Sequence, residues 1–441
     1  MTKQFARYES YNDSGIEWLG EIPAHWEIKK LKYLTSFINR GITPNYTEYS
    51  EYKVVNQATF SKGFLDIDAM RFHNNKNMSN TSRGIVNEND LLIASTGGGV
   101  LGKVAYINTQ VNNFVADSHV TMIRNNDLQS NKFLYYFYSV NFDLINAVLA
   151  QGSTNQTELQ RDWLINMFLP SPPIEKQQLI ADFLDKKTAQ IDEAIAQKEQ
   201  MIELLKEYRQ VTINNAVTKG LDPNVPMKDS GIVWLGQIPA HWEIKKLKYL
   251  TSYINRGITP NYTEYSEYKV VNQATFSKGF LDIDAMRFHN NKNMSNTSRG
   301  IVNENDLLIA STGGGVLGKV AYINTQVNNF VADSHVTMIR NNDLQSNKFL
   351  YYFYSVNFDL INTVLAQGST NQTELQRDWL INMFLSSPPI EEQKQIVDFL
   401  DKKTAQLDDA ILLKQSEIEK LKEYKATLID SSVTGKIKIN L

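Results

Sequence analysis

Two long stretches of the chain repeat apolar residues at intervals of three, four or seven positions and contain no glycine or proline. They cover residues 174–213 and 390–429. This spacing is typical of an amphipathic helix or of one strand of a coiled coil. The apolar positions are Ile180, Leu184, Ile191, Ile195, Ile202, Leu205 and Tyr208 in the first stretch, and Ile396, Leu400, Leu407, Ile411, Ile418, Leu421 and Tyr424 in the second.

A helix of this length must cover its apolar stripe. Each helix could pack on its own globular domain, or the two helices could pair antiparallel and hold the domains apart. The sequence favours antiparallel pairing, because two equal helices with matching stripes cover each other. A domain of about 170 residues also has enough core without a long helix.

The rest of the chain predicts globular domains of mixed secondary structure. Short runs such as KVVNQATF, DLLIAST, KVAYI and HVTMIR are separated by Asn, Gly and Asp clusters, as strands and turns are. A helical run, NKFLYYFYSVNFDLINAVLAQ, follows them. We therefore predict an α+β chain with globular domain 1–170, helix 171–215, linker 216–230, globular domain 231–386, helix 387–430 and C-terminal tail 431–441.

The chain is one unit written twice. GIEWLGEIPAHWEIKKLKYLTS begins at Gly15, and GIVWLGQIPAHWEIKKLKYLTS begins at Gly231. Residues 38–146 and 254–362 are identical over 109 residues. A period this long indicates a duplicated domain with its connector, because solenoid repeats are far shorter.

Composition narrows the class of protein. There are no cysteines, which excludes a disulfide scaffold, a thiol nucleophile and a cysteine-ligated metal. No apolar segment is long enough to span a bilayer, and the polar start of the chain is not a signal peptide, so we expect a cytoplasmic protein. The net charge is −3, so contacts to phosphates must come from local placement of Lys and Arg.

Catalytic motifs are weak, and we expect no catalytic residues and no metal site. Gly97, Gly102 and Lys103 match a phosphate-binding loop, but Val104 stands where Mg²⁺ coordination needs Ser or Thr. The flanks predict strand–turn–strand, so the loop is a glycine hairpin or a DNA-facing loop. Glu51 and Lys53 match only the end of a nuclease metal motif. An endonuclease or nucleotide hydrolase using these residues is the rival hypothesis, and a purely structural coiled-coil scaffold is the third.

The SPPI segment and the histidines give weaker predictions. Pro172 and Pro173 in SPPI predict a stop before a helix. The histidines have no metal-ligand spacing. His73 and His119 fall in polar segments and are open to solvent or DNA, whereas His25 is predicted to pack near Trp26.

Polar segments that combine Asn and Gln with Lys, Arg and hydroxyls predict contacts to a polymer. Residues 1–170 hold 20 Asn. Asn and Gln bond adenine in a bidentate manner, and Arg and Lys bond guanine or phosphate. The candidate DNA-binding residues are Arg40, Asn45, Gln57, Lys62, Arg71, Asn74, Asn75, Lys76, Ser95, Thr96, Lys103, Ser118, His119, Gln151, Ser153, Asn155 and Gln156, with the copies Arg256, Asn261, Gln273, Lys278, Arg287, Asn290, Asn291, Lys292, Ser311, Thr312, Lys319, Ser334, His335, Gln367, Ser369, Asn371 and Gln372.

Within this set we expect two roles. Base readers are Gln57, Asn74, Asn75 and Asn155 with their copies, and phosphate contacts are Lys62, Lys76 and Lys103 with theirs.

Several phrases resemble the specificity subunits of type I restriction–modification systems. They are SGIEWLGEIPAHWEIKKLK, SPPIEKQQLIADFLDKKTAQID, SSPPIEEQKQIVDFLDKKTAQLDDAI and SSVTGKI, and the order of parts over almost the whole chain also matches. The resemblance implies two target-recognition domains, one for each half of a bipartite DNA site, and an antiparallel coiled coil that sets their spacing. It also implies that QGSTNQTEL at 151–159 and 367–375 lies near DNA.

The resemblance further implies a chain without catalysis or cofactors of its own. Two methyltransferase subunits and restriction/translocation subunits would dock on it and bring S-adenosylmethionine, ATP and Mg²⁺. Family members usually carry two dissimilar recognition domains, and here the domains are nearly the same. We therefore predict a target of two copies of one half-site, inverted about an undefined spacer, with adenine as the methylated base.

Overall fold

The computed structural model describes the chain except residues 1–4, 62, 64, 77–80, 98, 109–110, 128–129, 142–149, 152–157, 278–280, 293, 314, 325, 344–345, 358–365, 368–373 and 441. The chain forms two compact units. Unit 1 is Met1–Lys198 with Ser416–Leu441, and unit 2 is Glu199–Gln415. Each unit is described by itself below.

Two long helices contribute to both units. They are α6 (Ile174–Lys219) and α12 (Ile390–Val433). The first part of α6 and the last part of α12 belong to unit 1, and the remaining parts belong to unit 2. The compact units therefore differ from the sequential blocks predicted above, because each draws on two segments that are far apart in the sequence.

The other elements of unit 1 run in the order β1 (Tyr11–Asp13), β2 (Glu21–Pro23), β3 (Glu27–Lys30), α1 (Leu31–Leu34), β4 (Thr35–Arg40), β5 (Tyr46–Thr47), β6 (Tyr52–Val55), η1 (Gln57–Phe60), β7 (Arg71–His73), η2 (Ser82–Gly84), β8 (Leu91–Ala94), β9 (Val104–Tyr106), β10 (Phe114–Ala116), β11 (Val120–Asn125), α3 (Ser130–Val140), β12 (Ala150–Gln151), β13 (Glu158–Leu159), α5 (Arg161–Asn166) and β14 (Phe168–Ser171).

Two four-stranded sheets form the centre of the globular domain in unit 1. One has the order β4-β11-β8-β9 and is antiparallel, and the other has the order β10-β6-β7-β5, with β10 and β6 parallel. Strand β8 is buried on both faces. Leu91 and Ile93 join the core that α3 and α6 cover, whereas Leu92 and Ala94 join the core of the other sheet. This is why its sequence, LLIA, is continuously apolar.

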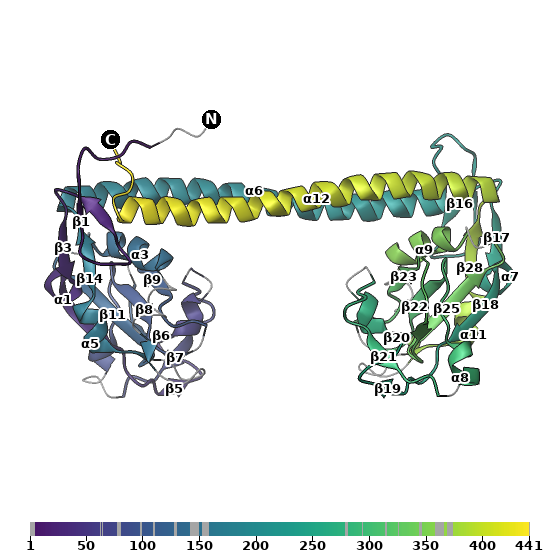
Figure 1. Cartoon of the computed structure of the whole chain (residues 1–441), viewed down its shortest axis with the longest axis horizontal. Coiled ribbons are helices and arrows are strands. Elements are labelled where there is room, and N and C mark those ends of the chain that lie inside the picture. Colours follow the sequence, from purple (N-terminus) through teal and green to yellow (C-terminus); the bar gives the residue numbers. More distant parts are fainter. Residues whose placement is uncertain are drawn as a thin grey trace. The chain divides into compact units, whose positions relative to one another are not determined.

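Helix α3 lies between the sheet and α6 in unit 1 (Figure 1). Its Phe133 and Phe137 are buried in the same core as Leu184 of α6. At the helix–helix contact, the Asp185 carboxylate accepts hydrogen bonds from the Lys132 ammonium and, at 2.6 Å, from the Tyr136 hydroxyl. The first part of α6 therefore packs on its own globular domain.

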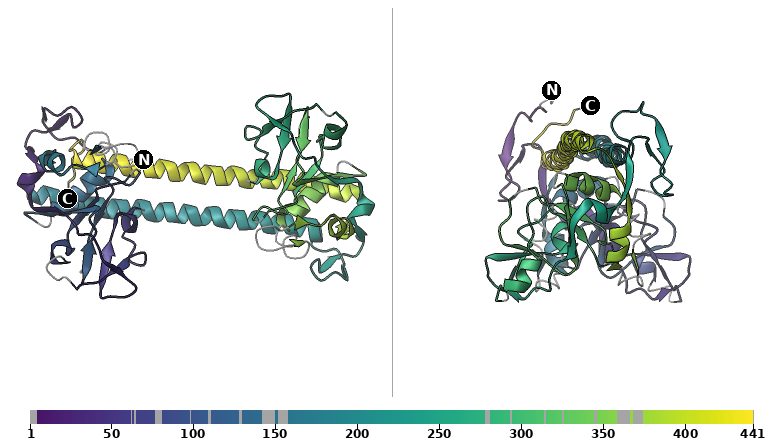
Figure 2. Two further views of the ribbon diagram at one scale, coloured as in Figure 1. Left: turned by 90° about the horizontal axis from the view of Figure 1, so that it is seen from below. Right: turned by 90° about the vertical axis from the view of Figure 1, so that its right-hand side faces the viewer.

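The same part of α6 also pairs antiparallel with α12. Within unit 1, Lys425 contacts Asp192 at 2.6 Å and Glu417 contacts Lys198 at 2.6 Å. Residue numbers along α12 therefore fall as those along α6 rise, which shows that the helices run antiparallel. The two segments lie side by side in the left view of Figure 2. Helix α6 therefore packs on a globular domain and also pairs antiparallel with α12, and the predicted antiparallel coiled coil is confirmed.

The C-terminal tail completes unit 1. The Lys438 amide donates to the Ala6 carbonyl at 2.7 Å, and the Tyr11 hydroxyl donates to the Gly435 carbonyl at 3.0 Å. Gly435 has φ 76°, and a Cβ there would lie 2.4 Å from the ring of Pro23. Only glycine therefore fits at this end of α12.

Unit 2 repeats the architecture with β15 (Met227–Asp229), β16 (Gln237–Pro239), β17 (Glu243–Lys246), α7 (Leu247–Leu250), β18 (Thr251–Arg256), β19 (Tyr262–Thr263), β20 (Tyr268–Val271), η3 (Gln273–Phe276), β21 (Arg287–His289), α8 (Met294–Arg299), β22 (Leu307–Ala310), β23 (Val320–Tyr322), β24 (Phe330–Ala332), β25 (Val336–Asn341), α9 (Ser346–Val356), β26 (Ala366–Gln367), β27 (Glu374–Leu375), α11 (Arg377–Asn382) and β28 (Phe384–Ser387). Its sheets have the orders β18-β25-β22-β23 and β19-β21-β20-β24. Arg209 of α6 contacts Asp408 of α12 at 3.0 Å.

The predicted apolar stripe is largely buried. Eight of its members, Ile180, Leu184, Ile191, Ile202, Ile396, Leu400, Leu407 and Ile418, are at most 7% exposed, and Ile195, Leu205, Ile411 and Leu421 are half-buried. Tyr208 and Tyr424 are wrong as stripe members, because they are 50% and 43% exposed.

Element ends and one strand differ from the sequence pattern. Helix α6 continues to Lys219, beyond the predicted end at 215, because Val217 is fully buried in the core of unit 2. The run KVVNQATF is a strand only to Val55. It then turns into the 3-10 helix η1, because Asn56 caps that helix by accepting from the Ala58 and Thr59 amides at 3.0 and 3.3 Å.

Candidate nucleic-acid interface

Three candidate residues from three separate loops meet in unit 1. The Thr96 hydroxyl lies 2.8 Å from Nδ1 of His119 and donates to Oε1 of Gln57 at 3.3 Å. Gln57 starts η1, Thr96 follows β8, and His119 precedes β11. His119 is exposed, and Gln57 and Thr96 are half-exposed. We call these three residues the Thr96 cluster.

Strand pairing and one turn position the Thr96 cluster. Val120 of β11 pairs with Ala94 of β8, which brings the residues just beyond those strand ends together. The Asp117 carboxylate accepts from the His119 amide at 2.5 Å and fixes the turn before β11. Asp117 was not among the predicted residues, although an Asp two residues before a turn amide is a known local signal.

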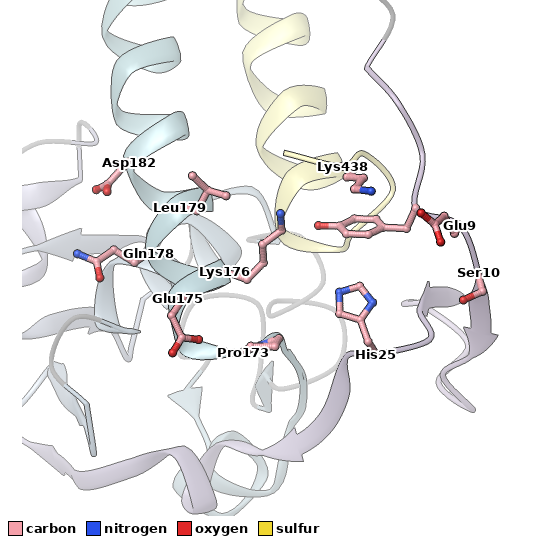
Figure 3. A pocket seen from close by; sticks show the side chains of 11 residues that line it. Glu9, Ser10, His25, Pro173, Glu175, Lys176, Gln178, Leu179, Asp182 and Lys438 are labelled. Atoms are coloured by element: carbon pink, nitrogen blue, oxygen red, sulfur yellow. The ribbon is translucent and has the colours of Figure 1, made fainter. Parts of the chain in front are cut away.

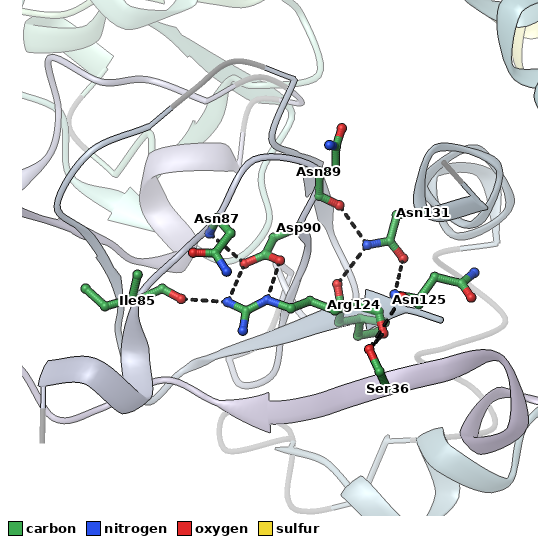
Figure 4. Close-up of polar contacts among 9 residues, drawn as sticks. Ser36, Ile85, Asn87, Asn89, Asp90, Arg124, Asn125 and Asn131 are labelled. Carbon is green, nitrogen blue, oxygen red and sulfur yellow. Dashed lines mark hydrogen bonds and ion pairs between the residues drawn. The ribbon is translucent and has the colours of Figure 1, made fainter. Parts of the chain in front are cut away.

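A buried ion pair holds the opposite end of the same two strands (Figure 4). Asp90 precedes β8 and is 1% exposed, and it accepts from Nε and Nη2 of Arg124 in β11 at 2.7 and 2.9 Å. Asp90 also accepts from the Asn87 amide at 2.8 Å, and Arg124 donates to the Ile85 carbonyl at 2.8 Å. Both oxygens of the Asp90 carboxylate and two nitrogens of the Arg124 guanidinium therefore take part in hydrogen bonds.

A short strand borders the Thr96 cluster. Thr96 forms a β-bridge with Glu158, and the Leu159 amide donates to the Ser95 carbonyl at 2.9 Å. Arg40 contacts the Glu158 carboxylate at 2.5 Å and donates to the Leu159 carbonyl at 3.2 Å. Arg40 thus holds the end of the QGSTNQTEL segment beside the Thr96 cluster. Glu158 lies in that segment but was not among the candidate residues.

The glycine-rich segment is a hairpin. It joins β8 to β9, which are antiparallel neighbours, so no helix follows the glycines. This confirms the predicted strand–turn–strand arrangement. The Lys103 ammonium, predicted to contact phosphate, donates to the Ser61 carbonyl at 2.6 Å and so braces the end of η1.

A second group of candidates gathers around β5 and β7, at the end of unit 1 that lies away from α6 (Figure 1). The Arg71 guanidinium lies 3.7 Å from the ring centroid of Tyr46. The Asn74 amide donates to the Asn45 carbonyl at 2.8 Å. The members of this Arg71 cluster are Asn45, Tyr46, Arg71, Asn74, Asn75 and Lys76.

Two expectations about polar residues are wrong. Ser95 and its copy Ser311 are fully buried, because they continue the alternation of the buried strand and bond Thr121 and Thr337. They have no surface to offer DNA. His73 lies in strand β7, not in a polar loop, and is 4% exposed. Its Nδ1 accepts from the Asn45 amide at 3.0 Å, and burial lowers the pKa of His73.

Other predicted residues differ in how much of them the structure describes and in their exposure. Ser118 is half-exposed beside His119, and Lys76 is exposed. His25 is exposed, with its ring 5.2 Å from that of Tyr8. Lys62, Ser153, Asn155 and Gln156, with the copies Lys278, Ser369, Asn371 and Gln372, lie outside the described residues. Gln151 and Gln367 are described only as backbone of β12 and β26.

Unit 2 holds the same arrangement. Thr312 lies 2.8 Å from Nδ1 of His335 and donates to Gln273 at 3.3 Å, and these three residues form the Thr312 cluster. The remaining copies keep the same environments: Arg256 pairs with Glu374, Lys319 donates to Ser277, Arg287 stacks on Tyr262 at 3.7 Å, Asn290 bonds Asn261, Asn291 and Lys292 follow β21, and Ser334 precedes His335.

Candidate metal ligands and the two residues of the nuclease-like motif were also located in the structure. No three His, Asp or Glu side chains among them are placed to share a metal ion. Glu51 is exposed and lies 3.4 Å from the Asn113 amide nitrogen. Across the described part of the chain, no helix is both long and apolar enough to cross a membrane.

A cavity of about 740 Å³ lies at the start of α6 in unit 1 (Figure 3). Tyr8, His25, Lys176 and Lys438 are among the residues that line it. Burial raises the pKa of Tyr8 to about 12, and burial, with the nearby Lys438 charge, lowers the pKa of Lys176. None of the candidate DNA-binding residues lines this cavity.

Comparison with known proteins supports the prediction made from the repeated phrases. Residues 23–204 and 239–423 match the family described as "Type I restriction modification DNA specificity domain". The MjaX specificity subunit of Methanocaldococcus jannaschii, described as a putative type I restriction enzyme subunit, is 24% identical over 99% of this chain and 98% of its own length. The EcoKI specificity subunit of Escherichia coli K12 is 26% identical over 61% of this chain and 58% of its own length.

Solved structures agree in fold. A chain from a study of complex assembly and conformational transition of a type I R-M system superposes with a TM-score of 0.72 at 15% identity, over 93% of this chain and 98% of that chain. The HsdS subunit of Thermoanaerobacter tengcongensis gives 0.55 at 15% identity, over 94% and 98%. The prediction of a specificity subunit, and not of an enzyme, is confirmed by the family match. The chain belongs to the family of type I restriction–modification DNA specificity domains and carries that domain twice.

Proposed function

We propose that this chain selects the DNA sequence for a type I restriction–modification complex. Each unit would contact one half of a bipartite site in double-stranded DNA. The observation that carries the proposal is the Thr96 cluster and its copy, in which three hydrogen-bonding side chains meet at an exposed edge with the same distances in both units. Such side chains bond base edges and phosphates.

The two half-sites are proposed to be the same and inverted. The loops proposed to contact DNA lie in or beside the 109 residues that are identical in the two copies. Both units therefore prefer the same bases. The helices carry equivalent residues and pair antiparallel, and two equivalent antiparallel helices exchange under a two-fold rotation. A two-fold protein matches a two-fold site on duplex DNA.

The chain would also act as the scaffold of its complex. We propose that two methyltransferase subunits and restriction/translocation subunits bind it in the cytoplasm. S-adenosylmethionine, ATP and Mg²⁺ would then be bound by those partners and not by this chain. The similarity to specificity subunits of type I restriction enzymes supports a place in a multisubunit complex.

Methylome sequencing of the host, with and without the gene, tests the target. The expected result is one motif with two identical half-sites in inverted orientation, methylated on adenine in both strands, that disappears with the gene. Two unrelated half-sites, or one half-site repeated in direct orientation, would contradict the proposal of symmetry.

The rival hypothesis of an endonuclease or nucleotide hydrolase has a direct test. The purified chain is expected neither to cleave DNA nor to hydrolyse ATP, and to yield methylation only after a methyltransferase subunit is added. Transfer of methyl groups from S-adenosylmethionine by the rigorously purified chain would overturn this assignment.

A further inference from the structure

We propose that the Thr96 cluster is a single base-reading device in which Thr96 fixes the hydrogen-bonding role of His119. The base it reads is adenine, approached from the major groove, and the Thr312 cluster does the same in the other half-site. This inference rests on the proposed function, because it names the base contacts that the DNA reader would use.

The direction of the hydrogen bonds follows from counting protons. A threonine hydroxyl has one proton, and Thr96 donates it to Oε1 of Gln57. The hydroxyl oxygen can then only accept from His119, so Nδ1 of His119 must carry the ring proton. In the neutral ring Nε2 is left without a proton and is a hydrogen-bond acceptor.

The two free ends of this chain of hydrogen bonds differ in character. At one end Nε2 of the exposed His119 accepts, and at the other end the amide nitrogen of Gln57 donates. Neither nitrogen has a hydrogen-bond partner within the part of unit 1 that the structure describes. The cluster therefore offers one acceptor and one donor to a ligand.

Gly97 makes room for this arrangement. It has φ 93°, and a Cβ there would lie 3.2 Å from the amide nitrogen of Gln57. A side chain would thus crowd the donor, and a residue other than glycine would be strained in this backbone conformation. At the other end of the cluster, the Asp117 carboxylate accepts a hydrogen bond from the His119 amide and fixes the backbone that carries the acceptor ring.

One hydrogen-bond acceptor together with one donor matches the major-groove edge of only one of the two purines. In the major groove adenine shows N7 as acceptor and the N6 amine as donor, whereas guanine shows two acceptors, N7 and O6. The Gln57 amide can donate to N7 while His119 Nε2 accepts from N6. Guanine would place O6 against the unprotonated Nε2, so two acceptors would face each other, and that is unfavourable.

The test compares Thr96→Val/Thr312→Val with Thr96→Ser/Thr312→Ser in the full chain bound to its methyltransferase partner. Valine keeps the shape of threonine but lacks the hydroxyl, whereas serine keeps the hydroxyl. The preferred duplex is first selected with the wild-type complex from a random library. Each adenine of the half-site is then replaced in turn by guanine, by 7-deazaadenine or by purine. 7-Deazaadenine lacks N7, and purine lacks the N6 amine.

The wild-type complex should lose about ten-fold or more in affinity per half-site when one particular adenine is changed in any of these ways. The valine variant should lose that discrimination, and the serine variant should keep it. Thr218→Val, at the end of α6, is the matched control and should behave as wild type. Thermal unfolding of each variant separates loss of discrimination from loss of folding.

Two outcomes would overturn the inference and leave DNA reading intact. One is a folded valine variant with the wild-type preference at every position. The other is a wild-type complex that tolerates both analogues at every adenine. If the wild-type complex selects no sequence from the library, the proposed function itself fails, and this inference fails with it.

Discussion

The buried pair of Asp90 and Arg124 gives the sharpest test of how the candidate interface is held. We consider Asp90→Ala, with Asp306→Ala as its matched variant in unit 2. Asp90 is 1% exposed and accepts three hydrogen bonds, two from Arg124 and one from the Asn87 amide. Its removal leaves the Arg124 side chain, 21% exposed, with a hydrogen bond to the Ile85 carbonyl at 2.8 Å and the Phe37 ring centroid 4.5 Å from its guanidinium.

The size of the effect follows from this geometry. Removing one partner of a buried ion pair costs about 3–5 kcal/mol, because the other charge stays buried and unpaired. The partial exposure of Arg124 and its bond to Ile85 place the cost near the lower end, at about 3 kcal/mol. For a domain of this size that lowers the melting temperature by about 6–12 °C.

Differential scanning calorimetry of the full chain measures the effect. Asp90→Ala and Asp306→Ala should lower the stability of their units by similar amounts, since Asp306 and Arg340 repeat the pair at 2.7 and 2.9 Å. Both should also weaken sequence-specific DNA binding, because the pair fixes the strands that position Thr96 and His119. A shift below about 2 °C, or two variants that differ widely, would refute the reasoning.

Three further predictions concern the helix seam, phosphate contacts and pH. The seam is the contact between α6 and α12. Ile202→Asp should abolish assembly with partners while the recognition domains stay folded, because Ile202 is 6% exposed in the seam but belongs to neither domain core. Intact complexes on a sizing column would contradict this. Lys76→Ala should weaken binding to all DNA sequences alike and lower the salt slope by about one unit, whereas an unchanged slope would exclude a phosphate contact. Burial lowers the pKa of His73, so the native state favours the neutral ring. Stability should be complete above the ordinary histidine value of about 6.5 and fall as pH drops from there toward the lowered folded pKa. His73→Gln should remove part of that slope in thermal unfolding, and an identical slope would show that other groups cause it.

The structure also changes which seam residues are informative. Leu184 and Leu400 are natural choices from the apolar period, but both belong to the cores of their units. A charge at either position would disturb the recognition domain as well as the helix pair. Ile202 and Ile418 are equivalent positions that the domain cores do not include, and they report on the seam alone.

The sequence by itself determined the plan of the chain. The duplication, the two helical stripes, the strand–turn–strand reading of the glycine segment and the lack of a complete catalytic motif are all local or self-comparing patterns. Such patterns hold whatever the rest of the chain does, because a helix period or a strand run depends on neighbours a few residues away. The family assignment rested on phrases that likewise stand complete in the sequence.

Only the tertiary structure decided which polar side chains share a surface. Gln57, Thr96 and His119 are separated by 39 and 23 residues. The register of β8 against β11 brings Thr96 to His119, and the fold places η1, which starts at Gln57, within hydrogen-bond distance of Thr96. The same register turns Ser95 inward, although it directly precedes Thr96 in an equally polar segment. Strand register and the two-segment make-up of each unit depend on contacts between distant residues, and no local pattern encodes those contacts.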